Sequence, residues 1–373
     1  MRIGVMLRSI DEKGGIGVYS RYITEELLKV DPRNEYVLFY RNRENIGRYS
    51  KYDNVEEKYV YAPNKALWDQ VAIPYAAKRE GINLIFHPKF TVPIFTNSKT
   101  VMVLHGADWF IPEFARFYNR YDILYVKKIM PIYCKKADFI ISVSELTTIN
   151  FINILGINPN KIRTIYFAAN DIFQPIRDDR VLGEVKLKYS LPDEFILTVT
   201  GYDPNRKERK NFGGVLSSFQ KLHEKYSCKL VVVGKECWRY KEDYKIDELK
   251  LGKDILFTGW VEQRDLPAFY NLASLYLYPS NVEAFPIPIC EAMACGCPIV
   301  TSNANGLYEI AGDAAILVDP NDSDQIAEAM FRILTSQELR RNLSEKGLQR
   351  SKLFSWKKCA KETLEIFESL NHN

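Results

Sequence analysis

Two glutamates in the second half of the chain are the residues best suited to bind a hydroxylated ligand. Glu283 lies in the loop after the apolar run Leu275–Tyr278, and Glu291 is predicted in the first turn of a helix that begins near Ile289. Carboxylates accept hydrogen bonds, so the pair suits hydroxyl groups rather than phosphates. Gly296 is predicted to end the helix in the left-handed conformation.

Positive charge gathers in a second loop, 201–211, after a predicted strand at 195–200. Arginine binds phosphate oxygens as a fork, and lysine binds them as a point charge. Facing a diphosphate, such a loop would stabilise its departure as a leaving group. A solvated loop is the simpler alternative. The basic residues are Arg206, Lys207, Arg209 and Lys210.

Near the N-terminus, Gly14, Gly15 and Gly17 lie at the start of a predicted helix at 17–29. Glycines there would let backbone amides approach a ligand at the helix N-terminus, although a plain strand-to-helix turn is equally consistent. His105 directly follows a predicted strand, at the sheet edge where catalytic groups of α/β proteins gather. A satisfied structural histidine is the alternative.

Elements that could position these residues alternate regularly between strand and helix, which predicts parallel sheets covered on both faces. A chain of 373 residues is long enough for two domains, each with its own core. The predicted strands are 3–7, 36–40, 84–87, 99–104, 139–143, 162–166, 195–200, 229–234, 275–278, 298–301 and 315–318.

Composition indicates a globular protein, with 46% hydrophobic and 26% charged residues. The net charge of +4 permits an anionic partner without requiring one, and no nucleic-acid partner is expected. Seven cysteines without framework spacing predict reduced thiols in the cytoplasm. No signal peptide and no membrane-spanning run are predicted, because no apolar run approaches about 20 residues.

The segment EAFPIPICEAMACGCPIVTS resembles the signature of retaining GT-B glycosyltransferases, specifically glycosyltransferase family 4 (group 1). Its hallmark is two glutamates separated by seven residues, the spacing of Glu283 and Glu291, followed by an E-A-M-A-x-G-x-P run. The Arg-Lys-Asn run at 209–211 resembles the family's phosphate-binding motif.

This resemblance covers nearly the whole chain and implies two Rossmann-like parallel-sheet domains facing across a cleft. The N-terminal acceptor domain would comprise 1–170 and a returning helix at 356–373. The C-terminal domain, 171–355, would bind the nucleotide-sugar donor.

Residue roles are also implied by the resemblance. Catalytic roles fall to His105, Glu283, Arg209 and Lys210, with Glu283 orienting a sugar hydroxyl and Glu291 holding the ribose. The backbone near Val261 would meet the nucleobase. Donor-binding residues are Gly15, Ile16, Gly17, Arg206, Val261, Phe285, Ile287, Pro288, Ile289 and Glu291. A metal-independent mechanism without a bound cofactor is expected.

The resemblance implies transfer of a hexose to a glycan or lipid-linked acceptor in surface polysaccharide synthesis. The favoured hexose is mannose, with GDP-mannose as its donor. The WDQ run at 68–70 and the general likeness to mannosyltransferases favour this donor. A UDP-sugar, such as UDP-glucose, is the close alternative. A catalytically silent sugar-nucleotide-binding protein and a dinucleotide-dependent oxidoreductase are alternatives of other classes.

Residues 109–136 are rich in aromatic and basic side chains, which a helical projection places on separate faces. One hypothesis is an aromatic stripe facing the core with a solvated basic face. The other is a dock for an anionic membrane surface or a lipid-diphosphate acceptor, which would make the protein peripheral at the inner membrane surface.

Overall fold

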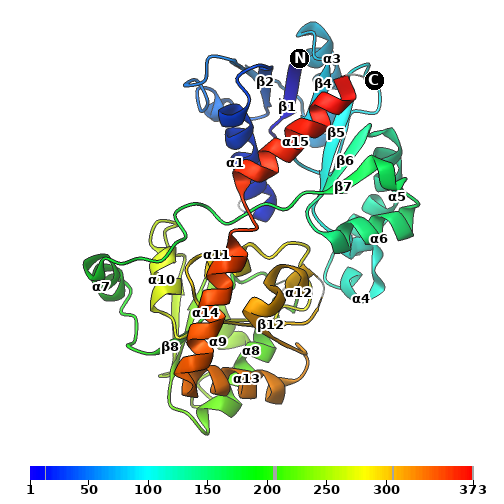
Figure 1. Ribbon diagram of the computed structural model, residues 1–373. Coiled ribbons are helices and arrows are strands. Elements are labelled where there is room, and N and C mark those ends of the chain that lie inside the picture. Colours follow the sequence, from blue (N-terminus) through cyan, green and yellow to red (C-terminus); the bar gives the residue numbers. More distant parts are fainter. Residues whose placement is uncertain (13, 205–207, 305, 372–373) are drawn as a thin grey trace. The chain divides into compact units, whose positions relative to one another are not determined.

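A computed structural model describes residues 1–12, 14–204, 208–304 and 306–371. Within them the chain forms two compact units, shown as a ribbon in Figure 1. The first unit comprises Met1–Ala115, Arg120–Phe167 and Ser355–Asn373. The second comprises Arg116–Asn119 and Ala168–Phe354.

In the first unit, the described strands form one seven-stranded parallel sheet in the order β3-β2-β1-β4-β5-β6-β7. The order reverses between β1 and β4, which makes this position the sheet's topological switch point. The strands are β1 (Arg2–Met6), β2 (Glu35–Tyr40), β3 (Val55–Tyr59), β4 (Leu84–His87), β5 (Lys99–Leu104), β6 (Phe139–Ser142) and β7 (Ile162–Thr164).

Helices cover both faces of this sheet, as expected for parallel strands. Helix α15 packs along α1 on one face (Figure 1). On that face the rings of Phe86 and Phe367 lie 5.2 Å apart. Apolar residues of α3 and α5 are buried on the other face. The helices are α1 (Gly15–Val30), α2 (Lys65–Leu67), α3 (Ile73–Arg79), α4 (Pro112–Ala115), α5 (Arg120–Lys136), α6 (Glu145–Leu155) and α15 (Trp356–Asn371), with a π-helical turn at Trp68–Ala72.

The second unit has a six-stranded parallel sheet among its described residues, in the order β10-β9-β8-β11-β12-β13. Its switch point lies between β8 and β11. The strands are β8 (Phe195–Val199), β9 (Lys229–Val233), β10 (Ile255–Gly259), β11 (Leu275–Tyr278), β12 (Ile299–Ser302) and β13 (Ala315–Val318).

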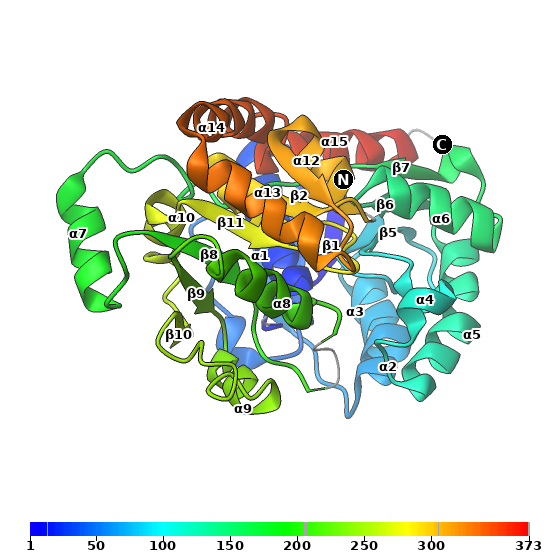
Figure 2. The ribbon, with the colours of Figure 1, turned by 90° about the horizontal axis from the view of Figure 1, so that it is seen from below.

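Apolar faces of α8 and α13 pack together over one side of this second sheet (Figure 2). On the other side, Tyr276 of β11 meets Tyr270 of α10 with ring centroids 5.3 Å apart. The helices are α7 (Asp179–Lys188), α8 (Phe212–His223), α9 (Tyr240–Asp243), α10 (Leu266–Leu272), α11 (Ile287–Ala294), α12 (Gly306–Ala311), α13 (Ser323–Thr335) and α14 (Gln337–Ser351).

A parallel α/β fold with two Rossmann-like sheets is therefore confirmed. The single helical face expected within 109–136 is wrong, because α4 and α5 are separated by four non-helical residues, 116–119. Phe117 is buried, whereas Tyr121, Leu124 and Tyr125 are each more than half exposed.

Candidate active site

The second unit brings the predicted basic loop and the predicted glutamate together. Arg209 and Lys210 lie between β8 and α8, and Glu283 lies between β11 and α11. Both loops leave the carboxyl ends of neighbouring strands at the switch point, which is the usual ligand-binding position of an open α/β sheet.

Buried Glu283 is the centre of a polar cluster whose two cations are partly exposed. Its Oε1 accepts from Lys210 Nζ at 2.5 Å, and its Oε2 accepts from Arg209 Nη2 at 2.9 Å. The Tyr278 hydroxyl donates to Glu283 Oε1 at 2.9 Å, and Lys210 Nζ also contacts that hydroxyl. The Ser280 hydroxyl adds a longer bond of 3.3 Å. Among the described residues, the two cations and one carboxylate of this cluster sum to a net positive charge.

Burial raises the pKa of Glu283, but the charges of Arg209 and Lys210 outweigh burial and lower it to about 2. Burial lowers the pKa of Lys210, and the Glu283 carboxylate opposes this. The carboxylate is therefore ionised at neutral pH and can only accept hydrogen bonds.

The second glutamate lies farther along α11 than expected. The helix begins at Ile287, so Glu291 lies in its second turn, and the predicted first-turn position is wrong. Pro288 fits at the start because its missing N–H lacks a helical partner there anyway. Tyr270 donates its hydroxyl to Glu291 Oε2 at 2.9 Å, and burial raises the Glu291 pKa to about 7.

Other predicted donor-binding residues lie near the same sheet edge. Val261 follows β10 and is buried, and Phe285 lies in the loop before α11. Ile287, Pro288 and Ile289 form the first turn of α11. Arg206 lies outside the described residues, so its predicted role stays a prediction.

Gly306 stabilises the Glu283 loop by close backbone contact. Its amide donates to Glu283 O at 3.0 Å. A Cβ at this position would lie 2.5 Å from Ala284 O and 2.7 Å from Glu283 O, which is too close for any side chain. The loop conformation therefore depends on glycine at 306.

The first unit has its own charged pair across its switch point. Lys89 follows β4, and its Nζ donates to Glu12 Oε1 at 2.5 Å. Helix α1 begins at Gly15, with Ile16 and Gly17 in its first turn. A Cβ on Gly17 would lie 1.8 Å from Glu12 O, so packing against that carbonyl already requires this glycine.

His105 follows β5 at the same edge. Its Nε2 lies 3.0 Å from Pro88 O, which can only accept, so Nε2 carries the proton and Nδ1 does not. Its ring packs edge-on against Tyr19 with centroids 5.0 Å apart. Burial lowers the pKa of His105 to about 4, so the ring is neutral at pH 7.

The sequence did not predict the tyrosine hydrogen-bond partners of Glu283 and Glu291, or a buried ion pair in the first unit. Tyr278 and Tyr270 lie in apolar stretches, where a tyrosine resembles any other core aromatic. Arg8 and Asp69 form a bidentate buried pair with distances of 2.7 and 2.9 Å. Only the position of Asp69 directly after Trp68, in a predicted helix, could have indicated that it is paired.

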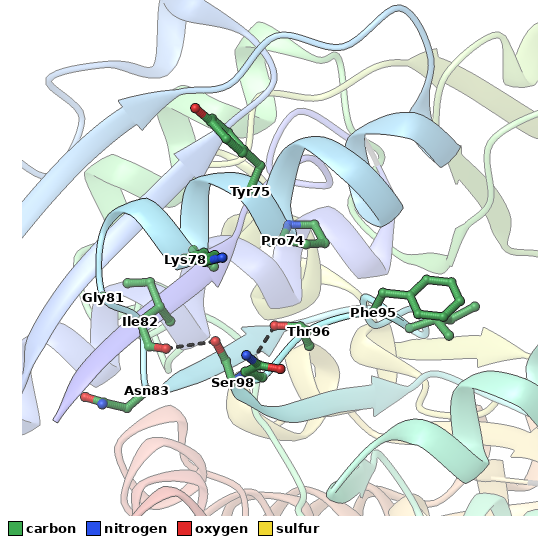
Figure 3. Close-up of a pocket in the computed structure, with 12 residues that line it drawn as sticks. Pro74, Tyr75, Lys78, Gly81, Ile82, Asn83, Phe95, Thr96 and Ser98 are labelled. Atoms are coloured by element: carbon green, nitrogen blue, oxygen red, sulfur yellow. Dashed lines mark hydrogen bonds between the residues drawn. The ribbon is translucent and has the colours of Figure 1, made fainter.

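A cavity of about 820 Å³ lies at the opposite, amino edge of the first sheet, before β4 and β5 (Figure 3). Tyr75 and Phe95 flank it, and both are highly exposed. None of the predicted site residues lines it.

No group of three or more His, Cys, Asp or Glu side chains within the described ranges could hold a metal ion. Likewise, none of the described helices has both the length and the apolar character needed to cross a bilayer.

Comparison with known proteins identifies the second unit. Residues 193–350 match the family described as glycosyl transferases group 1. Over these residues the second unit belongs to the group 1 glycosyl transferases. The matched range contains Arg209, Lys210, Glu283 and Glu291.

Individual relatives agree with this family. O-antigen chain mannosyltransferase B of Escherichia coli is 29% identical over 79% of this glycosyltransferase and 76% of the relative. Serotype-specific mannosyltransferase WbdA of Escherichia coli is 30% identical over 63% of the chain. The match covers 29% of WbdA, so the chain spans less than a third of that relative.

Solved structures share the fold. Anabaena Alr3699/HepE in complex with UDP superimposes with a TM-score of 0.76 over 99% of each chain, at 16% identity. This likeness shows that the glycosyltransferase has the GT-B fold.

Proposed function

We propose that this glycosyltransferase moves mannose from GDP-mannose to a glycan or lipid-linked acceptor in surface polysaccharide synthesis, with retention at the anomeric carbon. The observation that supports a nucleotide-sugar donor is the net positive cluster of Arg209, Lys210 and Glu283 at the switch point. Mannose as the sugar is supported by the two Escherichia coli mannosyltransferases.

The reaction breaks the bond between the anomeric carbon and a diphosphate oxygen and forms a bond to an acceptor oxygen. The acceptor's proton passes to the leaving phosphate. Negative charge develops on that phosphate, so preorganised cations contribute most to catalysis. Arg209 and Lys210 supply them, Glu283 accepts from a sugar hydroxyl, and Glu291 accepts from the ribose.

A second candidate is transfer from a UDP-sugar. It is favoured by the structural likeness to Alr3699/HepE, which was solved with UDP. The two candidates share all proposed phosphate contacts and differ at the base, which the backbone near Val261 would meet.

The test is transfer by the purified chain to a synthetic mannoside, with GDP-mannose and UDP-glucose offered separately. Transfer from GDP-mannose alone supports the first candidate, and transfer from UDP-glucose alone supports the second. The anomeric configuration of the product, read by NMR, tests retention: an inverted product would refute it.

Contact with an anionic membrane is part of the proposal. On α5, Tyr121, Leu124, Tyr125 and Ile132 are exposed, together with Lys128 and Lys135. Their spacing of three or four residues places them on one side of the helix, opposite buried Met130. Apolar side chains interspersed with lysines suit an interface of anionic lipids.

A further inference from the structure

A polar pocket of about 340 Å³ opens at the carboxyl edge of the first sheet. Its walls come from residues at or just after the ends of three neighbouring strands. Arg8 follows β1, Arg41 and Asn42 follow β2, and Tyr59 and Tyr61 lie at and after the end of β3. The volume is at the lower end of the range for small-molecule sites.

The strand order places this pocket relative to His105. Strands β1, β4 and β5 are successive neighbours, and His105 follows β5. Adjacent strands are about 4.8 Å apart, so the pocket begins about 10 Å from His105 along the edge and extends about 10 Å farther. That separation exceeds one pyranose ring, so a ligand filling the pocket would not itself be at the reacting centre.

Each charged side chain that lines the pocket already has a hydrogen-bond partner. The Arg8 guanidinium is held by both oxygens of Asp69, and the side chains of this pair are 7% and 5% exposed. The Asp11 carboxylate accepts from Asn45 Nδ2 at 2.9 and 3.1 Å. Arg41 donates to Pro63 O. Charges of both signs favour a neutral hydroxylated ligand over an anion.

Tyr61 adds a hydrophobic surface to this polar lining. Its side chain is 71% exposed, so one face of its ring is open to solvent beside the pocket. An aromatic face covers the C–H groups of a sugar, while Asn42 and Asp11 can donate to and accept from its hydroxyls. This combination suits a pyranose.

We infer that the pocket is a subsite for a sugar farther back along the acceptor glycan, behind the residue that receives the new sugar. The inference rests on the proposed function, because it assumes a glycan acceptor. It predicts that the enzyme distinguishes short acceptors from longer ones through Tyr61 and Asn42.

Direct binding tests the subsite without requiring turnover. α-Linked mannotriose is titrated against the full chain and followed by ligand-observed NMR. We expect Tyr61→Ala and Asn42→Ala each to weaken binding about three- to tenfold, the range for one stacked ring or hydrogen bond. Tyr75→Ala is the matched control, since Tyr75 is 72% exposed at the opposite edge of the sheet (Figure 3). It should bind like the wild type.

Three outcomes would overturn the subsite: no binding by the wild type at millimolar mannotriose, unchanged binding in Tyr61→Ala, or an equal loss in Tyr75→Ala. Displacement of mannotriose by millimolar inorganic phosphate would point to an anion site instead. Because Tyr61 and Asn42 are exposed, unchanged thermal unfolding should confirm that their variants fold.

Transfer kinetics then separate the subsite from the proposed function. With mono- and trimannoside acceptors, Tyr61→Ala should raise KM for the trimannoside about three- to tenfold and leave the monomannoside unchanged. Equal effects on both acceptors would refute the subsite. Absence of any transfer would instead count against the proposed donor or acceptor, while the binding result would stand.

Discussion

At the scale of single residues, the two glutamates of the signature differ in ionisation although only seven residues separate them. Glu283 is surrounded by two cations, and its pKa is lowered to about 2. Glu291 accepts a hydrogen bond from the Tyr270 hydroxyl, and burial raises its pKa to about 7. The sequence predicts both as acceptors but contains no sign of this difference, because the surroundings that cause it come from other elements.

The raised pKa of Glu291 predicts that the free energy of unfolding depends on pH. Between pH 4.5 and 7 the folded state holds a proton that the unfolded state releases, so stability falls as pH rises through this window and is constant above it. Glu291→Gln removes the cost of ionising this buried carboxyl. It should stabilise the second unit by up to about 3 kcal/mol at pH 8, with little effect near pH 4.5. Urea unfolding at both pH values measures this.

A suitable control is Glu338→Gln, at an exposed position in the first turn of α14. It should leave the difference between the two pH values unchanged. Parallel pH profiles for the wild type and Glu291→Gln would show that Glu291 is not the cause.

Gly306 offers a second residue-scale prediction. In Gly306→Ala the new methyl group would meet the carbonyls of Glu283 and Ala284, so the loop must shift. We expect a loss of about 1–3 kcal/mol in stability and reduced transfer, because Glu283 moves with its backbone. Gly183→Ala in α7, where a Cβ has open space, should be neutral or slightly stabilising. Full activity in Gly306→Ala would contradict the claim that the loop position matters.

At the scale of elements, helical periodicity predicted helices less reliably than short apolar runs predicted strands. Buried strands such as β4 and β9 were predicted from short apolar runs. Edge strand β3, with the sequence VEEKY, was missed because its charged residues hide the alternation. The prediction of one helical face within 109–136 was wrong because the non-helical residues 116–119 separate α4 from α5. A helical projection drawn across this break places residues of two different helices on one face.

The outer face of α5 can be tested with vesicles. At low salt the protein should float with liposomes containing anionic lipid and not with neutral ones. Changing Leu124 and Tyr125 together to serine should reduce the bound fraction several-fold. Leu187→Ser is the control, because Leu187 is 82% exposed on α7. Equal flotation of the double variant and the wild type would exclude this helix face.

At the scale of the whole molecule, boundaries between the two units lie at 167–168 and 354–355, besides those on either side of Arg116–Asn119. The sequence resemblance implied a passage at 169–175 and a returning helix at 356–373. Within the first unit, the rings of Phe167 and Trp356 pack at a tilt with centroids 5.0 Å apart, and Tyr19 contacts both rings. This aromatic cluster anchors the returning helix to α1.

Trp356→Ala should therefore destabilise the first unit by about 3–5 kcal/mol, the usual cost of emptying a buried aromatic position. The unfolding transition of the second unit should stay where it is. Trp238→Ala in the second unit, at a position 54% exposed, should shift neither transition by much. Differential scanning calorimetry measures both, and an unchanged first transition in Trp356→Ala would refute the anchoring role.

Much of the fold, and the cluster of Arg209, Lys210 and Glu283, could be predicted from the sequence, since strands, glycines and the glutamate signature are local patterns. The pairing of Arg8 with Asp69, 61 residues apart, could not, because it depends on a tertiary contact. The same is true of the subsite at Tyr61, which combines the ends of three strands. Local sequence shows which residues can do chemistry, and the fold decides which of them meet.

The central claim is that the Arg209, Lys210 and Glu283 cluster holds the departing diphosphate. The most direct test is the rate of GDP release from GDP-mannose with a mannoside acceptor, comparing Lys210→Ala with Lys221→Ala. Lys221 lies on α8 in the same unit and pairs with Asp324, away from the cluster. The account predicts a fall of roughly a hundredfold or more for Lys210→Ala, about 3 kcal/mol of barrier, with Lys221→Ala near the wild type. Lys210→Ala within a few-fold of the wild type would contradict it.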